Sequence, residues 1–178
     1  HEAEQGFNIG KIVKFMTGMN VHTAGMTVNR WCGSSMQSVH IAAGAISMGA
    51  GNAFICCGVE SMTRVPMNGF NPMPHPKLNE DNPNVYLSMG VTAENVAKKY
   101  QLTRQSQQDF SISSHQKAFN AESKGNFKDE ITKVNGCIKD GAIRPNTNQE
   151  ILDGLKLAFD ENGTITAGTS SPLTDGAA

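Results

Sequence analysis

The chain has 178 residues, which is enough for one domain or for one domain with an insertion. Its formal net charge of -1 gives no electrostatic basis for binding nucleic acid or an anionic membrane surface, so we expect neither kind of partner. Charged residues make up 17% of the chain, below the roughly 25% of a typical soluble protein, so we expect another subunit or further chain to cover part of the surface.

The first predicted elements flank or fall within residues 31–59, a stretch that contains no charged side chain. We expect a short strand at Met26–Trp31, a helix at Gly33–Met48 and a second, apolar strand at Ala53–Val59. Glycines and polar side chains within the stretch argue against a membrane span. The helix is indicated by apolar residues at helical spacing: Met36, Val39, Ala43 and Ile46. Strand, helix and buried strand together predict a βαβ unit and an α/β fold.

The pattern changes after Glu60. Five prolines predict an extended loop for residues 61–83. Thr103 is expected to cap a long helix at Arg104–Lys124 that Gly125 closes. Three further short elements are expected. Thr92 would cap a helix at Ala93–Tyr100, and another short helix is expected at Ile151–Leu157. Thr164–Ser171 would be a strand that runs into a small-residue turn.

The cysteine pattern indicates free thiols. The four cysteines, Cys32, Cys56, Cys57 and Cys137, form no CxxC pair and no Cys/His cluster, so we expect no metal site. Neighbours in a strand point to opposite faces, so Cys56 and Cys57 are poor disulfide partners, and we expect both to be structural. Cys137 is expected to be a loop thiol without function. Free thiols fit a reducing compartment, so we expect a cytoplasmic location.

Cys32 lies in the sequence "VNRWCGSSMQ", where the expected strand meets the expected helix. The start of a helix favours an anion, and the thiolate is the nucleophilic form of cysteine. Gly33, Ser34 and Ser35 are small and would let a substrate approach closely. A free cysteine is, however, also among the most buried residue types and packs as a small apolar side chain. The residues alone therefore leave two interpretations open, a nucleophile and a packing residue.

Longer segments resemble the thiolase family. The stretch "VNRWCGSSMQSVHIAAGAISMGAGNAFICCGVESMTRVPM" resembles its nucleophile region, whose usual pattern is VNR-x-C-x-S-[GS]-[LM]-Q. The likeness continues through "MGVTAENVAKKYQLTRQSQQDF", "FKDEI" and "AFDENGTITAGTSSPLTDGAA", in order along essentially the whole chain. The forms CGSSMQ and SMTRVPM are most similar to bacterial 3-ketoacyl-CoA thiolases of fatty-acid β-oxidation.

The resemblance implies an acetyl-CoA C-acyltransferase with a thiolase-like α/β fold. Cys32 would attack the 3-keto carbon of a 3-ketoacyl-CoA and carry the acyl group as a thioester, and coenzyme A would be a co-substrate rather than a permanently bound cofactor. The resemblance also implies a set of substrate and CoA contacts: Met89, Arg144, Phe159, Ala167 and Ser171.

The resemblance further implies a division of the chain and a set of partners. Residues 1–61 would form a partial N-terminal core with the nucleophile, residues 62–172 the CoA-binding loop domain, and residues 173–178 the return into the core. The family forms homodimers, often paired into tetramers, and bacterial β-oxidation thiolases also bind a multifunctional hydratase/dehydrogenase subunit. We expect such partners here.

Two catalytic segments of the family do not occur in this sequence, a GHP-type histidine and a second cysteine in C-x-G-G-G. None of the histidines matches the first: His1, His22, His40, His75 and His115. The resemblance therefore implies a fragment without the start of the N-terminal half and without the C-terminal half. We expect the 178 residues alone to be inactive or nearly so.

Three alternatives to a β-oxidation thiolase stay open at this stage. A biosynthetic acetoacetyl-CoA thiolase has the same chemistry, and its products with long and with four-carbon ketoacyl-CoA would distinguish it. A condensing enzyme of the ketoacyl-synthase type shares fold and nucleophile but would accept acyl-carrier protein. A noncatalytic fragment that binds CoA or holds subunits together would lack a reactive thiol at Cys32. A papain-type protease is not favoured by "RWCGSSM".

Overall fold

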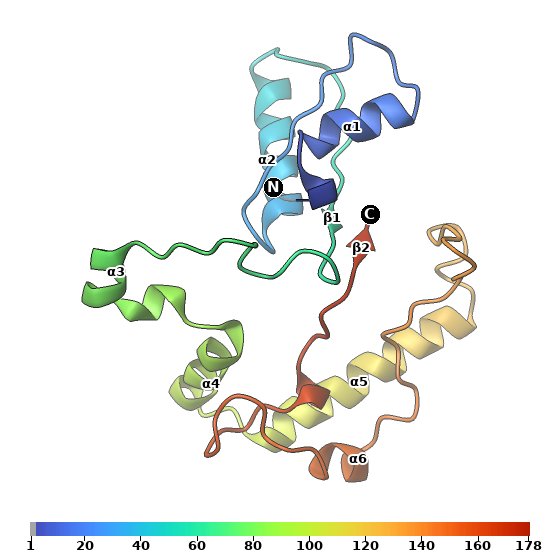
Figure 1. Ribbon diagram of the computed structural model, residues 1–178. Helices are drawn as coiled ribbons and strands as arrows, with labels where there is room; N and C mark the ends of the chain where they lie inside the picture. The colour runs from blue at the N-terminus through green and yellow to red at the C-terminus, as the bar shows by residue number, and fades with distance from the viewer. Residues whose placement is uncertain (1–2) are drawn as a thin grey trace. The chain divides into compact units, whose positions relative to one another are not determined.

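The computed structural model describes residues 3–178 of the chain (Figure 1). Two compact units are present, one made of His1–Met73 together with Leu173–Ala178 and the other of Pro74–Pro172. We refer to them as the first unit and the second unit. Among the described residues, no helix combines the length and the apolar character needed to cross a membrane.

The first unit contains two α-helices and one pair of short strands. Its elements are η1 (Ala3–Gln5), α1 (Ile9–Met16), α2 (Ser34–Ser47), β1 (Val59–Glu60) and β2 (Gly176–Ala177). The strands pair antiparallel, with Val59 opposite Ala177, and backbone bonds between Gly58 and Ala178 extend the pairing by one residue. The last residues of the chain, 176–178, are therefore hydrogen-bonded to residues 58–60, which follow α2 in the sequence.

Close backbone approach fixes α1 in the first unit. A Cβ placed on Gly10 would lie 2.5 Å from the carbonyl oxygen of Met26, and one on Gly25 would lie 2.5 Å from the backbone of Lys11. The two glycines therefore let α1 and the 25–26 segment approach more closely than any other residue type would allow. Lys14 of α1 is buried, and its ammonium group donates to the carbonyl of Val21 at 3.2 Å.

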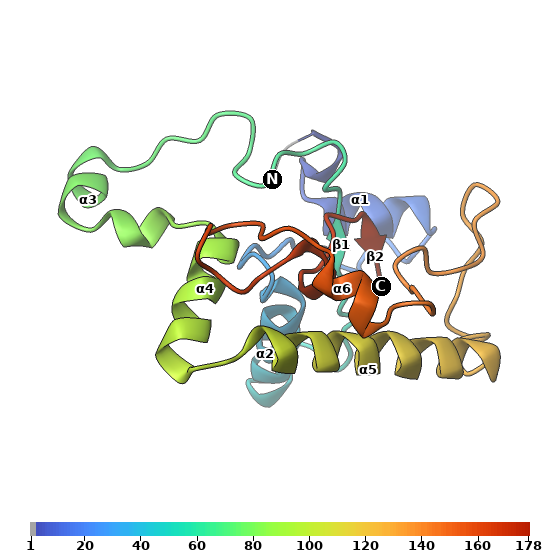
Figure 2. The same ribbon diagram turned by 90° about the horizontal axis from the view of Figure 1, so that it is seen from below.

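The second unit holds most of the helices. Its elements are α3 (Pro76–Asp81), η2 (Pro83–Tyr86), α4 (Met89–Tyr100), α5 (Arg104–Ser123), α6 (Gln149–Asp153) and η3 (Ala167–Thr169). The short helix α6 lies beside α5 in both views of the ribbon (Figures 1 and 2). The buried apolar residues of this unit, Ala97, Leu152 and Ile165, come from α4, α6 and the segment before η3, so the core lies among these elements.

Polar side chains hold α6 against α5. Arg104, the first residue of α5, donates through Nη2 to the carbonyls of Leu152, Asp153 and Leu155 at 2.8–3.1 Å. These carbonyls lie at the end of α6, where the last carbonyl groups have no partner within the helix. Gln149 of α6 donates to the side chain of buried Gln108 at 2.6 Å. A short helix of marginal intrinsic stability is thereby anchored at both ends.

The helix predictions are confirmed for the two longest helices and need adjustment for the shorter ones. Helix α2 begins and ends within one residue of the expected range, and Thr103 caps α5 by accepting from the backbone N–H of Ser106 at 3.1 Å. Helix α4 begins one turn earlier than expected, because Ser88 rather than Thr92 is its cap. Helix α6 ends before Leu157, and residues 76–86 form α3 and η2 rather than an extended loop.

The strand predictions differ from the structure. In residues 3–178 the paired strands are β1 and β2 alone, so Met26–Trp31 and most of Ala53–Val59 are not paired, and the βαβ unit with parallel strands is not formed. A strand is stabilised by hydrogen bonds to a neighbouring strand, and no described strand runs along either segment. The expected burial of Cys56 and Cys57 was also wrong, since both are exposed. Thr164–Ser171 pairs only at Thr166 before it enters η3.

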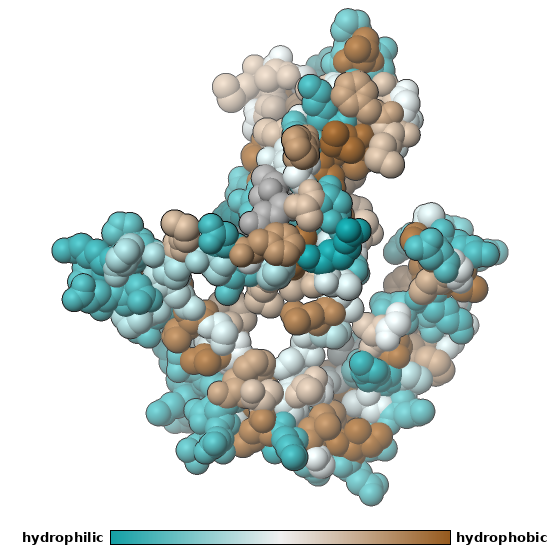
Figure 3. Space-filling view, viewed as in Figure 1, coloured by the Kyte–Doolittle hydropathy of each residue, from teal (hydrophilic) through white to brown (hydrophobic). Residues whose placement is uncertain are grey.

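Apolar side chains remain on the surface of the first unit. Figure 3 shows many of them on its visible face, and Phe15, Val39, Ile46 and Ile55 are each about half exposed or more. A monomeric soluble protein rarely leaves so many large apolar groups in contact with water. This agrees with the low charge content, which predicts a surface that is partly covered.

Candidate active site

Cys32 lies on a tight turn directly before α2. Its thiol is exposed, and Gly33, the N-cap residue of α2, makes no side-chain capping bond. The turn is closed by two backbone bonds, from Gly33 to the carbonyl of Arg30 at 3.1 Å and from Ser34 to the carbonyl of Trp31 at 3.0 Å. The first N–H groups of a helix attract an anion, so negative charge that develops at this position during a reaction would be stabilised.

The backbone immediately before Cys32 is unusual. Trp31 has φ of 51°, in the left-handed region that bulky residues rarely adopt. Such a conformation persists only where the surroundings stabilise it, and it occurs often at functional sites. Here the side chain of Asn29 accepts from the backbone N–H of Trp31 at 3.0 Å.

Ser34 stabilises the same turn from the helix side. Its hydroxyl donates to the carbonyl of Trp31 at 2.6 Å and accepts from the backbone N–H of Arg30 at 2.8 Å. The guanidinium group of Arg30 donates to the side chain of Gln37 at 2.7 Å, one turn further along α2. Arg30 and Trp31, the two residues before Cys32, are therefore hydrogen-bonded to α2, which holds the thiol at the start of the helix. Sequence reasoning missed this role of Ser34, although the serine follows the cysteine at a spacing typical of a local side-chain cap.

The segment that contains Cys56 and Cys57 runs past the first turn of α2. A Cβ on Gly58 would overlap the hydroxyl oxygen of Ser35, so only glycine allows this approach. Position 58 therefore sets the distance between the β1 segment and the start of α2. His40, on the same helix, is exposed.

The residues predicted to contact CoA lie in the second unit. Met89 is the first residue of α4 and is exposed, and Phe159 packs across the next residue, Gly90, where a Cβ would overlap its ring. Ala167 begins η3, and Ser171 follows it by four residues; both are exposed. Met89 and Phe159 are thus brought together by Gly90, and Ala167 and Ser171 lie in one short turn.

Helix α5 connects that turn with Arg144. Ser111 donates its hydroxyl to the carbonyl of Gly168 in η3 at 2.6 Å, and the ring nitrogen Nδ1 of His115 accepts from the backbone N–H of Arg144 at 3.2 Å. Ser111 and His115 are four residues apart and so lie on one face of the helix. The η3 turn and the backbone of Arg144 therefore contact successive turns of the same face of α5, and the side chain of Arg144 is exposed.

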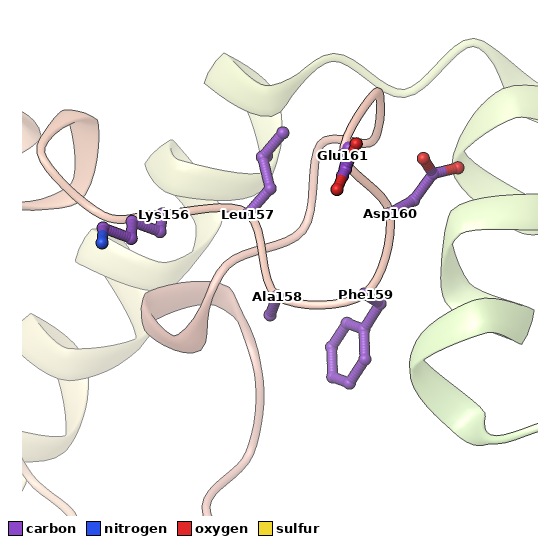
Figure 4. A pocket seen from close by; sticks show the side chains of 6 residues that line it. All are labelled: Lys156, Leu157, Ala158, Phe159, Asp160 and Glu161. Carbon is purple, nitrogen blue, oxygen red and sulfur yellow. The ribbon is translucent and has the colours of Figure 1, made fainter.

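A shallow pocket of about 460 Å³ lies on the loop that carries Phe159. Its lining residues are consecutive: Lys156, Leu157, Ala158, Phe159, Asp160 and Glu161. Figure 4 shows the ring of Phe159 and the carboxylate of Glu161 on opposite sides of this loop. The lining of the pocket combines apolar side chains with one cationic and two acidic side chains.

Glu94 of α4 holds this loop in place and was not anticipated from the sequence. The carboxylate is buried and accepts from the backbone N–H groups of Thr164 and Ile165 at 2.9–3.1 Å and from the hydroxyl of Thr164 at 3.3 Å. Gly163 makes the approach possible, because a Cβ there would overlap the carboxylate. Glu94 and buried Ala97 lie three residues apart on α4, and a charged residue on the apolar face of a helix is the sequence signal that could have identified it.

No cluster of metal-binding side chains occurs in the described part of the chain, residues 3–178. Cys32 belongs to the first unit, and the predicted CoA contacts belong to the second.

Comparisons with known proteins agree with one another. The family model described as "Thiolase, N-terminal domain" matches residues 1–178. A 3-ketoacyl-CoA thiolase of Bacillus subtilis is 41% identical over 194 aligned positions, which cover 99% of this chain and 50% of that protein. A 3-ketoacyl-CoA thiolase of Idiomarina loihiensis is 45% identical over 185 positions, covering 98% and 48%. The chain thus spans about half the length of the curated relatives it matches.

Solved structures give the same result. The dimeric peroxisomal thiolase of Saccharomyces cerevisiae matches with a TM-score of 0.84 and 32% identity, covering 94% of this chain and 45% of that one. Human mitochondrial 3-ketoacyl-CoA thiolase in complex with CoA matches with a TM-score of 0.83 and 28% identity, covering 98% and 48%.

Proposed function

We propose, because this chain belongs to the thiolase family and has a partial thiolase fold, that it carries the nucleophile of an acetyl-CoA C-acyltransferase and that Cys32 is this nucleophile. The observation that carries the proposal is the exposed thiol on a hydrogen-bonded turn directly before the uncapped start of α2. A thiolate at this position gains from the helix dipole and from unpaired N–H groups.

The proposed reaction proceeds in two steps. In the first, the sulfur of Cys32 attacks the 3-keto carbon of a 3-ketoacyl-CoA, and the backbone N–H of Cys32 would help to hold the developing oxyanion. The bond between carbons 2 and 3 breaks, its electron pair takes up the proton that the thiol has lost, and acetyl-CoA leaves. In the second, the thiol of a fresh coenzyme A takes the acyl group, and its proton returns to Cys32. The second step exchanges one thioester for another, so the acyl-cysteine intermediate is close in energy to the acyl-CoA product.

The second unit supplies the proposed CoA contacts. Met89, Phe159 and Ala167 would contact apolar parts of the acyl or pantetheine chain, Ser171 would face pantetheine, and Arg144 would lie near the adenine or ribose-phosphate end. Three features support this assignment. Phe159 packs on Gly90, next to Met89. The η3 turn and the backbone of Arg144 are hydrogen-bonded to the same face of α5, and the 156–161 loop carries both apolar and charged side chains. Coenzyme A would act as a co-substrate. The division into residues 1–61, 62–172 and 173–178 is proposed on the same basis.

The whole protein is proposed to act on 3-ketoacyl-CoA, as the names of its relatives favour. A place in fatty-acid β-oxidation is proposed from the resemblance of CGSSMQ and SMTRVPM. We infer a homodimer or tetramer, since large apolar side chains are exposed on the first unit and the yeast relative is called dimeric. A multifunctional β-oxidation subunit is a further proposed partner. Exposed free thiols favour the reducing cytoplasm.

Thiol labelling tests the nucleophile directly. The folded chain is treated near neutral pH with limiting iodoacetamide, and alkylation at each cysteine is followed by peptide mass analysis. We expect Cys32 to react several-fold faster than Cys137, which is also exposed but is remote from any helix start. In denaturant the two rates should become similar, since exposure alone then decides. Equal rates in the folded chain, or slower alkylation of Cys32, would contradict the proposal.

Trapping the intermediate tests the reaction class in the whole protein. Incubation with a 3-ketoacyl-CoA and rapid acid quenching should leave the shortened acyl group on the peptide that contains Cys32. The variant Cys32→Ser should lose this adduct, and the variant Cys137→Ser should keep it. An acyl group found on another cysteine would rule out the assignment.

A further inference from the structure

The chain contains three Asn–Gly steps, and one of them forms the tip of a hairpin. They are Asn68–Gly69, Asn135–Gly136 and Asn162–Gly163. At the hairpin, φ is 48° for Asn135 and 85° for Gly136, as expected for the two central residues of a two-residue turn with left-handed backbone. Val134 and Cys137 close the turn with backbone bonds of 3.1 and 2.8 Å.

We propose that Asn135 is a site of spontaneous covalent modification, by deamidation through a cyclic imide. The backbone nitrogen of Gly136 attacks the side-chain amide carbon of Asn135. A new C–N bond forms, the bond to the amide nitrogen breaks, and ammonia leaves with the proton that the Gly136 nitrogen loses. Water then opens the ring at either carbonyl and yields aspartate or isoaspartate. No oxidant or reductant takes part, and asparagine is among the residues that limit chemical durability of proteins.

The three Asn–Gly dipeptides differ in the hydrogen bonding of the backbone nitrogen that would attack. The backbone N–H of Gly69 donates to the carbonyl of Pro66 at 2.8 Å, and that of Gly163 donates to the carbonyl of Asp160 at 3.0 Å. Both nitrogens must break a hydrogen bond before they can attack. Among the described residues, the N–H of Gly136 has no such partner.

Exposure and packing also favour deamidation at Asn135 over the other two Asn–Gly dipeptides. Asn135 and Gly136 are both exposed, whereas Gly69 and Gly163 are half-buried. Gly163 is also packed against the buried carboxylate of Glu94, so rearrangement there would disrupt the bonds to the 164–165 backbone. The attack requires the nitrogen to lose its proton and the chain to bend locally, and an exposed hairpin tip opposes neither.

The modification would change both the charge and the backbone of the hairpin. Either product adds one negative charge at neutral pH. Isoaspartate also inserts one carbon into the main chain, so the Val134–Cys137 pair can no longer close with its two hydrogen bonds. The thiol of Cys137, which donates to the carbonyl of Lys139 at 3.3 Å, belongs to the same turn. Modification at Asn135 should therefore be visible as a local loss of structure in residues 134–139.

The experiment incubates the folded chain at mildly alkaline pH and follows each of the three Asn–Gly peptides by mass. Deamidation raises the mass by the difference between a carboxylic acid and an amide, and chromatography separates the isoaspartyl form. We expect the Asn135 peptide to convert at least several-fold faster than the other two. Asn135→Gln should remove the fastest conversion and leave the slow ones unchanged.

The unfolded chain provides the internal control, because all three steps have the same Asn–Gly sequence. In denaturant the three conversion rates should approach one another, with Asn68 and Asn162 gaining most. Conversion of Asn68 or Asn162 at a rate equal to or above that of Asn135 in the folded chain would overturn the proposal. A rate order unchanged by denaturant would overturn its structural basis.

Discussion

The buried carboxylate of Glu94 makes the most quantitative prediction. Its two oxygens accept from the backbone N–H groups of Thr164 and Ile165 and from the Thr164 hydroxyl. These bonds hold the segment that links Phe159 to Ala167, both of which are proposed CoA contacts. We therefore expect Glu94→Ala to release this segment while helix α4 itself stays folded, because alanine is the best helix former.

The magnitude follows from the number of groups left unpaired. Ile165 is 7% exposed, so its N–H cannot turn to water, and Thr164 is half-buried. An unsatisfied buried donor costs about 1–3 kcal/mol, so two of them cost about 2–6 kcal/mol in Glu94→Ala. Glu94→Gln keeps one acceptor oxygen and exchanges charge-assisted bonds for neutral ones. The smaller cost expected there is about 1–2 kcal/mol.

Hydrogen exchange of the two amides measures the effect locally. A loss of about 1.4 kcal/mol in local stability speeds exchange about tenfold, so Glu94→Gln should give about a tenfold increase and Glu94→Ala clearly more. Amides of α5 such as that of Gln108 should change less. Glu80→Gln is the matched control, since Glu80 is an exposed carboxylate on α3 of the same unit.

Two results would refute this reasoning about Glu94. If Glu94→Ala changed exchange at Thr164 and Ile165 no more than the control does, the carboxylate would not hold the segment. If Glu94→Gln were as damaging as Glu94→Ala, loss of charge rather than loss of acceptors would decide the stability.

Two further predictions concern the first unit. Gly10→Ala should destabilise it by about 1–3 kcal/mol despite the higher helix propensity of alanine, because the new Cβ would meet the Met26 backbone. Gly44→Ala, in the interior of α2 with open space around it, should stabilise the unit by about 0.5–1 kcal/mol. Denaturant titration measures the free energy of unfolding of both variants. Changes of the same sign in the two variants would contradict the packing argument. The backbone N–H of Thr63, which donates to Asp175 at 2.8 Å, and then the Thr63 side chain hold the pKa of Asp175 below its usual value. The contribution to stability is therefore complete above the ordinary aspartate pKa and is lost as pH falls through the lowered one. NMR titration of the carboxyl should show the low value. The protection of the Thr63 amide, taken relative to its intrinsic exchange rate at each pH, should fall with acid, as it does in Asp175→Asn at neutral pH.

The helices that the sequence predicted best are those whose signals are local. Thr103 caps α5 as expected, and the apolar spacing from Met36 to Ile46 locates α2 to within one residue. A cap bonds to a backbone group three residues away, and helix hydrogen bonds join residues four apart, so both can be recognised in a short window. Cys32 at the start of α2 was predictable for the same reason.

Choices between competing local signals were less certain. Ser88 and Thr92 both precede a helical segment, and the structure selects Ser88, so α4 gains a turn. Pro76 at the start of α3 is compatible with a helix as well as with a loop, because a proline at the first helical position loses no hydrogen bond. Prolines alone therefore predicted too long a loop for residues 61–83.

Sequence by itself determined the two long helices, the thiol before α2 and the absence of a metal-binding cysteine pattern, since each depends on residues a few positions apart. Tertiary structure alone decided three things: the unpaired state of residues 26–29 and 53–57, the contact of Gly58 with Ser35, and the burial of Glu94 against Thr164 and Ile165. The physical reason is sequence separation. A strand pair, a close backbone approach and a buried carboxylate all need partners that are brought together only when the chain folds, and no local pattern encodes which partner that is.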